Sequence, residues 1–497
     1  MSILKDLEPK NVFYFFEELC NIPHGSGNTA GITAYLMQFA AERNLEAICD
    51  EIGNVIIRKP ATPGYENVPG IVLQGHTDMV AVKKPESKKD MQTEGLDLAI
   101  EGDYVYAIDT SLGGDDGIAI AYGLAVLDSE DLKHPEIELV ATVDEETGLF
   151  GAKAIDLSHL KGRRFLNLDS EEEGIFWTSC AGGVRVESTL PVDMASVCGQ
   201  KFTVAVKGLQ GGHSGADIHR ERGNALYLLA RVLYHAYKEV PFYVASFYGG
   251  TVENAIPREA IAEIVLPCLT EFNAEQKAMD SASEQATSFC NTVKALEQAL
   301  KAEYAVRDAG LYVEVVKEKT DAYAVYSQES TKKVLCLLTA APVGVQAMSQ
   351  DVPGLVETSL NLGVVTGDDT AVVIQHSIRS SLESAKIALL EKLAAVLELA
   401  GASYTTSGDY PGWAYRADSP LRDKLVRIYE DMFGKKPSIQ AIHAGLECGL
   451  FLGKVPDLDC VSLGPNMYAI HTTEEKLSIS STERIWEFLV AVLADKA

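Results

Sequence analysis

Apolar runs that end in polar residues dominate the first third of the chain. Residues 28–44 have helical spacing after a polar cap at Asn28, which predicts a helix. The apolar segment 117–127 predicts a buried helix. Apolar strands that alternate with helices are typical of a mostly parallel sheet covered by helices. Such sheets bind ligands just beyond their strand ends. Three runs predict buried strands with polar residues at that position: 71–76 (IVLQGH), 137–146 (IELVATVDEE) and 164–170 (RFLNLDS).

The pattern changes near residue 187 and changes back near residue 405. Between them, segments 246–267 and 360–381 each look like two strands around a turn followed by a helix, which indicates two similar halves. We therefore predict an α/β fold in which a mixed, mostly parallel sheet flanked by helices is interrupted by an α+β lid domain. The expected catalytic domain comprises 1–187 and 405–497, and the expected lid domain comprises 188–404.

Composition narrows the classes of function. The formal charge of −28, from 71 acidic and 43 basic residues, disfavours binding to nucleic acid or to anionic lipid. Since the chain has no run of about 18 apolar residues and its first residues do not form a signal peptide, we expect no membrane association. The nine cysteines are scattered without a CxxC pair, which indicates free thiols in a reducing compartment and predicts a cytoplasmic location.

Two short motifs carry candidate metal ligands. His76 and Asp78 lie in GHTDMV, where spacing of two on an extended chain puts both side chains on one face. Asp115 and Asp116 lie between glycines in LGGDDG, at the start of the predicted buried helix. Each motif has an ordinary alternative when taken alone: a loop histidine for the first and an acidic helix cap for the second.

The segment VDEETG adds two adjacent glutamates directly after an apolar strand. Neighbouring side chains point in different directions, so one carboxylate of Glu145 and Glu146 can bind a metal while the other transfers protons. Asp169 ends the next strand in the same way, and His471 follows an apolar stretch near the C-terminus, where a core or loop histidine is the ordinary alternative. A crowd of carboxylates would repel without a cation. Together these residues predict a site for two Zn²⁺ ions, with Mn²⁺ and Co²⁺ as alternatives.

Eight motifs together resemble the aminoacyl-histidine dipeptidase family, the cytosolic non-specific dipeptidases among the co-catalytic zinc peptidases. The resemblance extends over nearly the full chain. It implies an enzyme of broad specificity that hydrolyses dipeptides, with Xaa-His among the candidates, and whose substrates are small peptides. It also implies a homodimer. An aminoacylase or a carboxypeptidase-type amide hydrolase of the same superfamily is the alternative. The motifs follow one another as GHTDMV, LGGDDG, DEETG, NLDSEE, GGHSGADIH, YPGW, IHAGLECGLF and AIHTTEE.

The resemblance also assigns roles. It makes Glu145 the general base that acts on a zinc-bridged water, and Asp78 a support for His76. The choice of Asp115 over Asp116 as the bridging carboxylate rests on alignment alone, and a cis peptide bond is implied after Asp115. The implied metal ligands are His76 and Asp169 for one ion, Glu146 and His471 for the other, and Asp115 for both.

The predicted lid supplies a second group of residues by resemblance. His213, in GGHSGADIH, is expected to stabilise the oxyanion, with a polar loop histidine as the alternative. Arg379 is expected to grip the C-terminal carboxylate of the substrate, which suits the fork of a guanidinium group. Asn254 is expected to contact substrate, and Gly445 to offer a backbone N–H at a helix start. Whether His219 and Trp413 contact substrate stays open, since surface exposure and packing are equally plausible roles.

Overall fold

The chain forms two compact units in the computed structural model, which describes residues 2–268 and 275–497. Unit 1 consists of Met1–Ser179, Tyr415–Ala441 and Leu446–Ala497, and unit 2 consists of Cys180–Ala414 and Ile442–Gly445. Each unit has its own cluster of buried hydrophobic side chains. The sequence pattern placed the divisions at 187/188 and 404/405. The observed ones lie further out because β9 (Gly182–Pro191) and β19 (Ser403–Tyr410) pair with each other in the sheet of unit 2.

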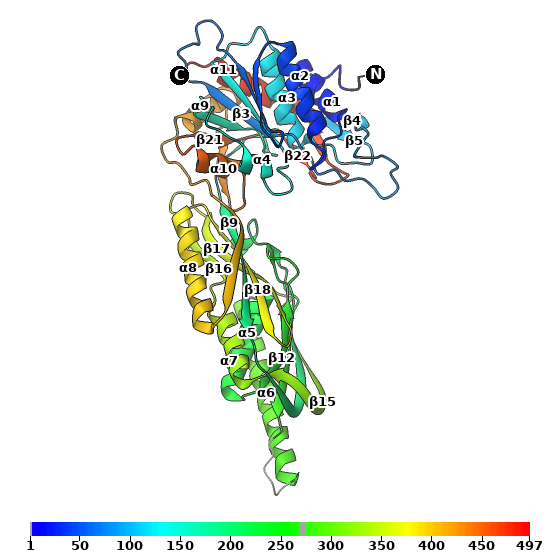
Figure 1. Ribbon diagram of the computed structural model, residues 1–497, viewed down its shortest axis with the longest axis vertical. Coiled ribbons are helices and arrows are strands. Elements are labelled where there is room, and N and C mark those ends of the chain that lie inside the picture. The colour runs from blue at the N-terminus through cyan, green and yellow to red at the C-terminus, as the bar shows by residue number, and fades with distance from the viewer. Residues whose placement is uncertain (1, 269–274) are drawn as a thin grey trace. The chain divides into compact units, whose positions relative to one another are not determined.

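A mixed sheet forms the centre of unit 1 (Figure 1). Parallel pairing joins β6, β3, β7 and β21, while β1, β2 and β8 add antiparallel pairs at the two sides. The predicted mixed α/β fold is therefore confirmed, with antiparallel flanks that the apolar runs did not reveal. In the described residues the strand order is β1 (Glu46–Cys49), β2 (Val55–Lys59), β6 (Ile137–Thr142), β3 (Ile71–His76), β7 (Arg164–Asn167), β21 (Asp459–Ser462), β8 (Ile175–Cys180) and β20 (Ser438–Ile442).

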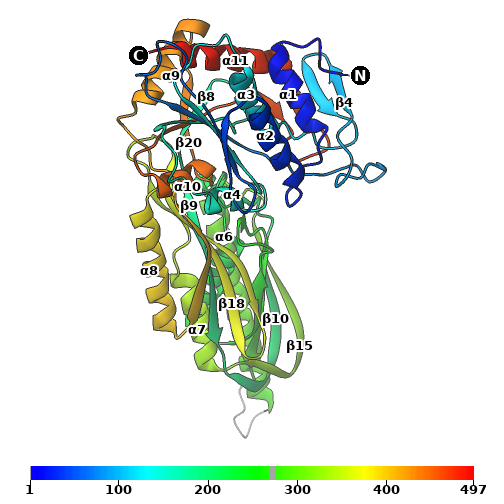
Figure 2. The ribbon, with the colours of Figure 1, turned by 45° about the horizontal axis from the view of Figure 1, so that its top comes forward.

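Helices cover both faces of this sheet. On one face Leu166 of β7 joins the large buried cluster, and on the other face its neighbour Phe165 packs against Phe451 with 5.0 Å between ring centroids. Figure 2 shows α1, α2 and α3 close together on unit 1. The helices of unit 1 are α1 (Lys10–Cys20), α2 (Ala30–Glu42), α3 (Gly114–Asp128), α4 (Phe150–Ala154), α9 (Pro420–Phe433), α10 (Glu447–Lys454) and α11 (Ile479–Ala494).

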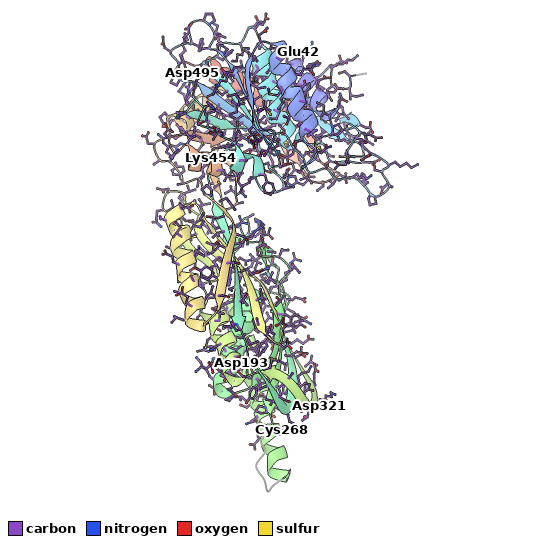
Figure 3. All side chains as sticks on the ribbon, in the orientation of Figure 1. Glu42, Asp193, Cys268, Asp321, Lys454 and Asp495 are labelled. Atoms are coloured by element: carbon purple, nitrogen blue, oxygen red, sulfur yellow. The ribbon has the colours of Figure 1, made fainter. Side chains whose placement is uncertain are left out.

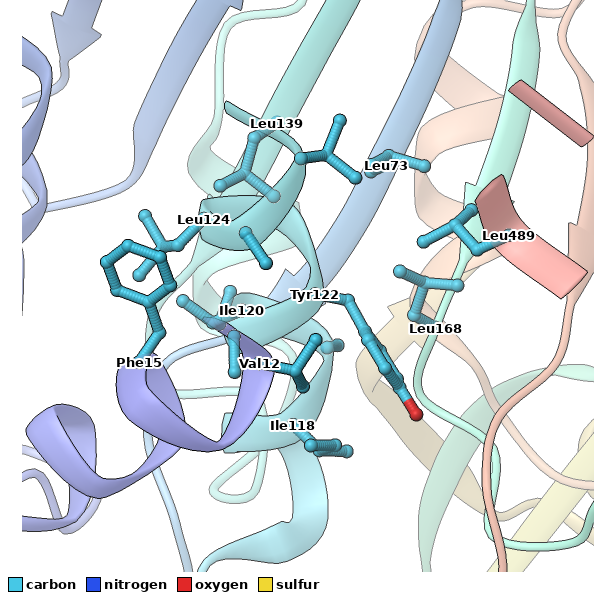
Figure 4. Close-up of a cluster of buried hydrophobic side chains, with 14 of the residues drawn as sticks. Val12, Phe15, Leu73, Ile118, Ile120, Tyr122, Leu124, Leu139, Leu168 and Leu489 are labelled. Carbon is cyan, nitrogen blue, oxygen red and sulfur yellow. The ribbon is translucent and has the colours of Figure 1, made fainter. Parts of the chain in front are cut away.

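Helix α3 lies in the hydrophobic core of unit 1, as its apolar sequence predicts. Figure 4 shows its side chains surrounded by residues of α1, β3, β6 and α11. A Cβ atom on Gly123 would lie 2.4 Å from Leu139, so glycine at this position allows α3 to approach β6 closely. This packing fixes the start of α3, which carries Asp115, relative to the strand ends. A small second sheet in unit 1 pairs β22 (Met467–Tyr468), β23 (Lys476–Ser478), β5 (Tyr104–Ala107) and β4 (Leu98–Glu101).

Unit 2 is an antiparallel sheet with helices packed on it. Alternate residues such as Val184 and Val186, or Val204 and Val206, belong to one buried cluster with the helices, so one face of the sheet is covered. Asp321 and Cys268 lie near the same end of this sheet, where Gly199 pairs with both neighbouring strands (Figure 3). The described strand order is β15 (Tyr312–Tyr326), β10 (Met194–Lys207), β14 (Ala260–Pro267), β12 (Tyr243–Gly249), β17 (Val356–Gly367), β18 (Ala371–Ser380), β9 and β19, with β16 (Gly344–Met348) on β17.

The remaining elements of unit 2 agree with the α+β character expected for the insertion. The short strands β11 (Gly212–His213) and β13 (Ala255–Ile256) form a separate pair beside the short helix η1 (Ile218–Arg220). The helices are α5 (Ala225–Glu239), α6 (Glu275–Glu303), α7 (Gln328–Ala340) and α8 (Glu383–Ala400). Among the described residues of both units, none of the helices has the length and apolar character needed to cross a membrane.

Candidate metal and catalytic centre

Three parallel strands of unit 1 end at the same edge of the sheet, and candidate ligands lie at or just after each strand end. His76 is the last residue of β3 and pairs with Thr142, the last residue of β6. Gln74 of β3 pairs with Asn167 at the end of β7. Because the carboxyl ends of parallel strands meet at one edge, His76, the glutamates after β6 and Asp169 after β7 converge there.

Asp115 lies between the two histidines. Its Oδ1 is 3.0 Å from Nε2 of His76, and its Oδ2 is 3.0 Å from Nε2 of His471. Oδ1 of Asp169 is 3.6 Å from Nε2 of His76, while Oε1 of Glu146 is 2.8 Å from Nε2 of His471. The structure therefore brings all five sequence-predicted ligands into one continuous cluster, with Asp115 at its middle.

This set of donors fits divalent metal ions. Burial lowers the pKa of His76, but the neighbouring carboxylates, Asp169 first, outweigh it and raise the pKa well above its ordinary value. Hydrogen bonds to Asp115 and Glu146 raise the pKa of His471 to about 10. The carboxylates thus favour a positive charge at this cluster, and a bound metal cation would supply it without protonated imidazoles. Imidazole and carboxylate donors together suit zinc.

Asp116, the alternative to Asp115, makes different contacts. The Asp115–Asp116 peptide bond is cis, as the resemblance implied. Oδ2 of Asp116 accepts the backbone N–H of His76 at 3.1 Å, and the side chain is fully buried. Asp116 can also group with His76 and Asp169 around one ion. Only Asp115, however, is within 3.0 Å of both histidines among the contacts of the described chain.

Asp78 contacts both His76 and the segment that carries Glu145. Nδ1 of His76 donates to the backbone carbonyl of Asp78 at 2.9 Å, and the carboxylate itself is 3.5 Å away. That carboxylate accepts the backbone N–H of Glu145 at 2.9 Å and the hydroxyl of Ser26 at 2.7 Å. Asp78 therefore orients His76 chiefly through its backbone, and its side chain fixes the backbone of Glu145.

The carboxyl of Glu145 is suited to accept a proton near neutral pH. Burial raises its pKa to about 8, and the negative charges of Glu447, Glu146 and Asp115 add to the rise. A general base works best when its pKa lies near the operating pH. A bound cation nearby would move this pKa back towards neutrality.

A buried polar network that the sequence did not predict lies behind the ligands. Glu447, at the start of α10, is fully buried and accepts hydrogen bonds from Gln74 and from the hydroxyl of Thr142, the latter at 3.0 Å. Oε1 of Gln74 accepts from Nδ2 of Asn167 at 2.6 Å. The network joins the ends of the three ligand-bearing strands. Its signal in the sequence was a polar residue inside each apolar run, at positions 74, 142 and 167.

Because Glu447 is buried, we expect the stability of the metal-free protein to depend on pH. Burial raises the pKa of its carboxyl from 4.5 to about 7, and the charge of Asp169 adds to the rise. The folded state therefore holds this proton more tightly, so stability falls as the pH rises from the unfolded pKa to the folded one. With a chelator present, we expect the unfolding free energy of the wild-type protein to fall by up to about 3 kcal/mol between about pH 5 and pH 7. The Glu447→Gln variant lacks this titrating group and should not show this fall. Urea denaturation across this range measures it, and equal pH slopes for the two proteins would contradict it.

Two of the other predicted residues of unit 2, His213 and Gly445, lie near Arg379 of β18 or its partner Tyr410, and Asn254 lies beside the His213 segment. Nη1 of Arg379 donates to the hydroxyl of Tyr410 at 3.2 Å, and a Cβ on Gly445 would lie 2.9 Å from the same tyrosine ring. Burial lowers the pKa of His213, and the charge of Arg379 lowers it further. The backbone carbonyl of Asn254 accepts the N–H of Ser214, the neighbour of His213, at 2.8 Å.

Unit 2 also contains His443, His219 and Trp413. His443, which the sequence did not single out, is buried, and its Nε2 lies 2.8 Å from the hydroxyl of Ser359. Burial and the charge of Arg379 lower the pKa of His443 to about 3, so the ring is neutral. His219 is exposed in η1, whereas Trp413 is buried and pairs its backbone with Cys180. A cavity of about 760 Å³ is lined by residues that include Gly212, His213, Asn254 and Arg258.

Known proteins resemble the chain over its whole length. The model of peptidase family M20/M25/M40 matches residues 72–495. The cytosol non-specific dipeptidase of Escherichia coli (strain K12) is 37% identical over 497 residues, which cover 100% of this chain and 99% of that protein. The crystal structure of aminoacylhistidine dipeptidase from Vibrio alginolyticus matches with a TM-score of 0.93 and 37% identity, covering 99% of this chain and 98% of the other. The aminopeptidase PepT of Bacillus cereus shares the fold, with a TM-score of 0.56 and 17% identity over 99% of each chain.

Proposed function

Because the chain belongs to peptidase family M20/M25/M40, we propose that it is a dipeptidase that hydrolyses its substrate with two zinc ions. The observation that carries the proposal is Asp115, whose two oxygens each lie 3.0 Å from a histidine Nε2. Divalent metal binding follows from the family and from the clustered donors. Two ions would be held by His76, Asp169 and Asp115 on one side and by His471, Glu146 and Asp115 on the other.

The names of two relatives support dipeptides as the substrate class. Both the E. coli relative and the Vibrio relative are named as dipeptidases, and both match essentially the entire chain at 37% identity. The first name also supports a cytosolic location. A homodimer remains a prediction, which analytical ultracentrifugation would test.

The residues around the metal ligands suggest how the peptide bond is attacked. Metal ions bound here would lower the pKa of water and polarise the peptide carbonyl. Glu145 would take the proton from the attacking water and release it to the leaving amine. Asp78 supports this role because its carboxylate holds the backbone N–H of Glu145 at 2.9 Å. Fixing the base in place lowers the entropy lost on reaching the transition state.

Unit 2 supplies the groups we assign to substrate recognition. We assign Arg379 to bind the C-terminal carboxylate of the substrate. This assignment is supported by the buried Nε of Arg379, which has no hydrogen-bond partner among the described residues. Gly445 would offer a backbone N–H to the same carboxylate. His213 would stabilise the oxyanion and Asn254 would contact the substrate; their shared cavity supports both assignments.

A dipeptide panel tests the proposed function. Protein purified without added metal would be supplied with Zn²⁺, Mn²⁺ or Co²⁺ and assayed on free dipeptides, N-acetylated dipeptides and tripeptides. We expect hydrolysis of free dipeptides and little hydrolysis of the two control classes. Preference for the N-acetylated substrates would instead support an aminoacylase-type enzyme.

The Arg379 assignment predicts a selective loss of binding. Arg379→Lys keeps the charge but lacks the fork, so it should lose about 1.5–3 kcal/mol of hydrogen bonding to a carboxylate. We expect KM for dipeptides to rise about 10- to 100-fold, with metal content unchanged. The matched control is Arg185→Lys, on neighbouring strand β9, where the arginine is 63% exposed and pairs with Glu253. An unchanged KM for Arg379→Lys would count against the assignment.

A further inference from the structure

The carboxylate of Glu475 is enclosed by backbone amides of the loop that carries Asp115. Glu475 is 3% exposed, although it lies in a run of polar residues, TTEEK. The amides lie just before and at the start of α3, where N–H groups have no partner within the helix and favour an anion. Oε2 of Glu475 accepts the backbone N–H groups of Leu112 at 2.8 Å and Gly113 at 3.1 Å. Its Oε1 accepts the backbone N–H groups of Gly114 at 2.9 Å and Asp115 at 3.4 Å.

The loop is shaped to receive this carboxylate. Gly113 has a φ of 66°, a conformation that glycine adopts readily, and it precedes the first residue of α3. A Cβ atom on Gly114 would lie 3.3 Å from Oε1 of Glu475, which is tighter than ordinary contact. The two glycines therefore let four successive amides turn towards one side chain.

The same glutamate belongs to the segment that carries His471. Glu475 lies four residues after His471, and its backbone N–H donates to Thr472 at 3.3 Å. Its carboxylate thus joins the His471 loop to the Asp115 loop, although more than 300 residues separate them. Nε2 of His471 is then 3.0 Å from Oδ2 of Asp115.

The two histidines of the metal centre differ in how they are supported. His76 ends a buried strand, its side chain is 1% exposed, and its Nδ1 donates to a backbone carbonyl. The side chain of His471 is 43% exposed, and both Ala469 and His471 have positive φ values in a loop. The position of His471 therefore depends on how that loop is held, whereas His76 is held by the sheet.

We propose that Glu475 is a positioning residue that holds His471 against Asp115 for the metal ion on the Glu146 side. The inference rests on the two-metal centre of the proposed function. Removing this carboxylate should weaken the ion on the Glu146 side far more than the ion at His76 and Asp169. Loss of a group that orients a metal ligand lowers metal affinity about 10- to 100-fold.

The test compares Glu475→Gln with a matched buried cap that touches no metal ligand. Glutamine has the same shape but no charge, so it cannot accept from all four amides. The control is Asp459→Asn: Asp459 is also buried and accepts the N–H of Leu421 at 2.9 Å at the start of α9. Both variants and wild type would be titrated with Zn²⁺ by calorimetry, and the melting temperature of each metal-free protein would be measured.

We expect wild type and Asp459→Asn to take up two equivalents with similar affinities. Glu475→Gln should take up one equivalent at wild-type affinity and the second about 10- to 100-fold more weakly. Two tight equivalents in Glu475→Gln, or equal weakening of both, would overturn the inference. Fewer than two equivalents in wild type would overturn the two-metal centre and, with it, the selective loss. If Glu475→Gln does not fold, Glu475→Asp, which withdraws the charge by one methylene, should show the same selective loss.

Discussion

Asp115→Asn is expected to abolish binding of both metal ions and to reduce dipeptide hydrolysis by about 10³-fold or more. Each carboxylate oxygen of Asp115 lies 3.0 Å from Nε2 of one histidine, so this single side chain serves both halves of the cluster. An amide has one oxygen and no charge, and loss of metal assistance removes several kcal/mol of transition-state stabilisation. Zinc analysis after dialysis and steady-state kinetics measure the two effects.

The neighbouring aspartate is the control that decides between the two residues of the LGGDDG motif. Asp116 accepts the backbone N–H of His76, and the donor group that contains His471 includes Asp115 rather than Asp116, so Asp116→Asn should keep both ions. If Asp116→Asn loses both ions while Asp115→Asn keeps them, the bridge belongs to Asp116.

Glu145→Gln is expected to fold and bind metal normally but to lose about 10²- to 10⁴-fold in kcat, the contribution typical of a general acid–base group. The glutamine cannot accept the proton of water, yet its backbone N–H can still bond to Asp78. The comparison variant is Glu171→Gln, an exposed carboxylate near the same cluster. KM should change little, since Glu145 acts on the attacking water. Retention of most of the turnover with a full complement of metal would refute the assigned role.

The metal centre was predictable because its residues stand where buried strands end. The runs before His76, Glu145 and Asp169 are mostly apolar, so the sequence predicts both the strands and the polar groups at their ends. The resemblance added His471 and the order of the motifs, and the match to the peptidase family confirms that resemblance.

Other parts of the centre depend on the backbone and could not be predicted. Which of Asp115 and Asp116 faces the histidines depends on the backbone path through that dipeptide, which side-chain types do not reveal. Glu475 stands among polar residues that look solvated, and its burial depends on the loop at residues 112–115. Likewise, the short segment 442–445 joins unit 2 although the pattern around it belongs to unit 1. Such long-range pairings leave no periodic trace in the sequence.

The most direct measurement of the central claim is anomalous diffraction at the zinc edge from crystals grown with zinc. We predict two peaks per chain, both about 2.0–2.2 Å from an oxygen of Asp115. One should also be bound by His76 and Asp169, and the other by Glu146 and His471. A single peak, or two peaks that do not share Asp115, would contradict the account.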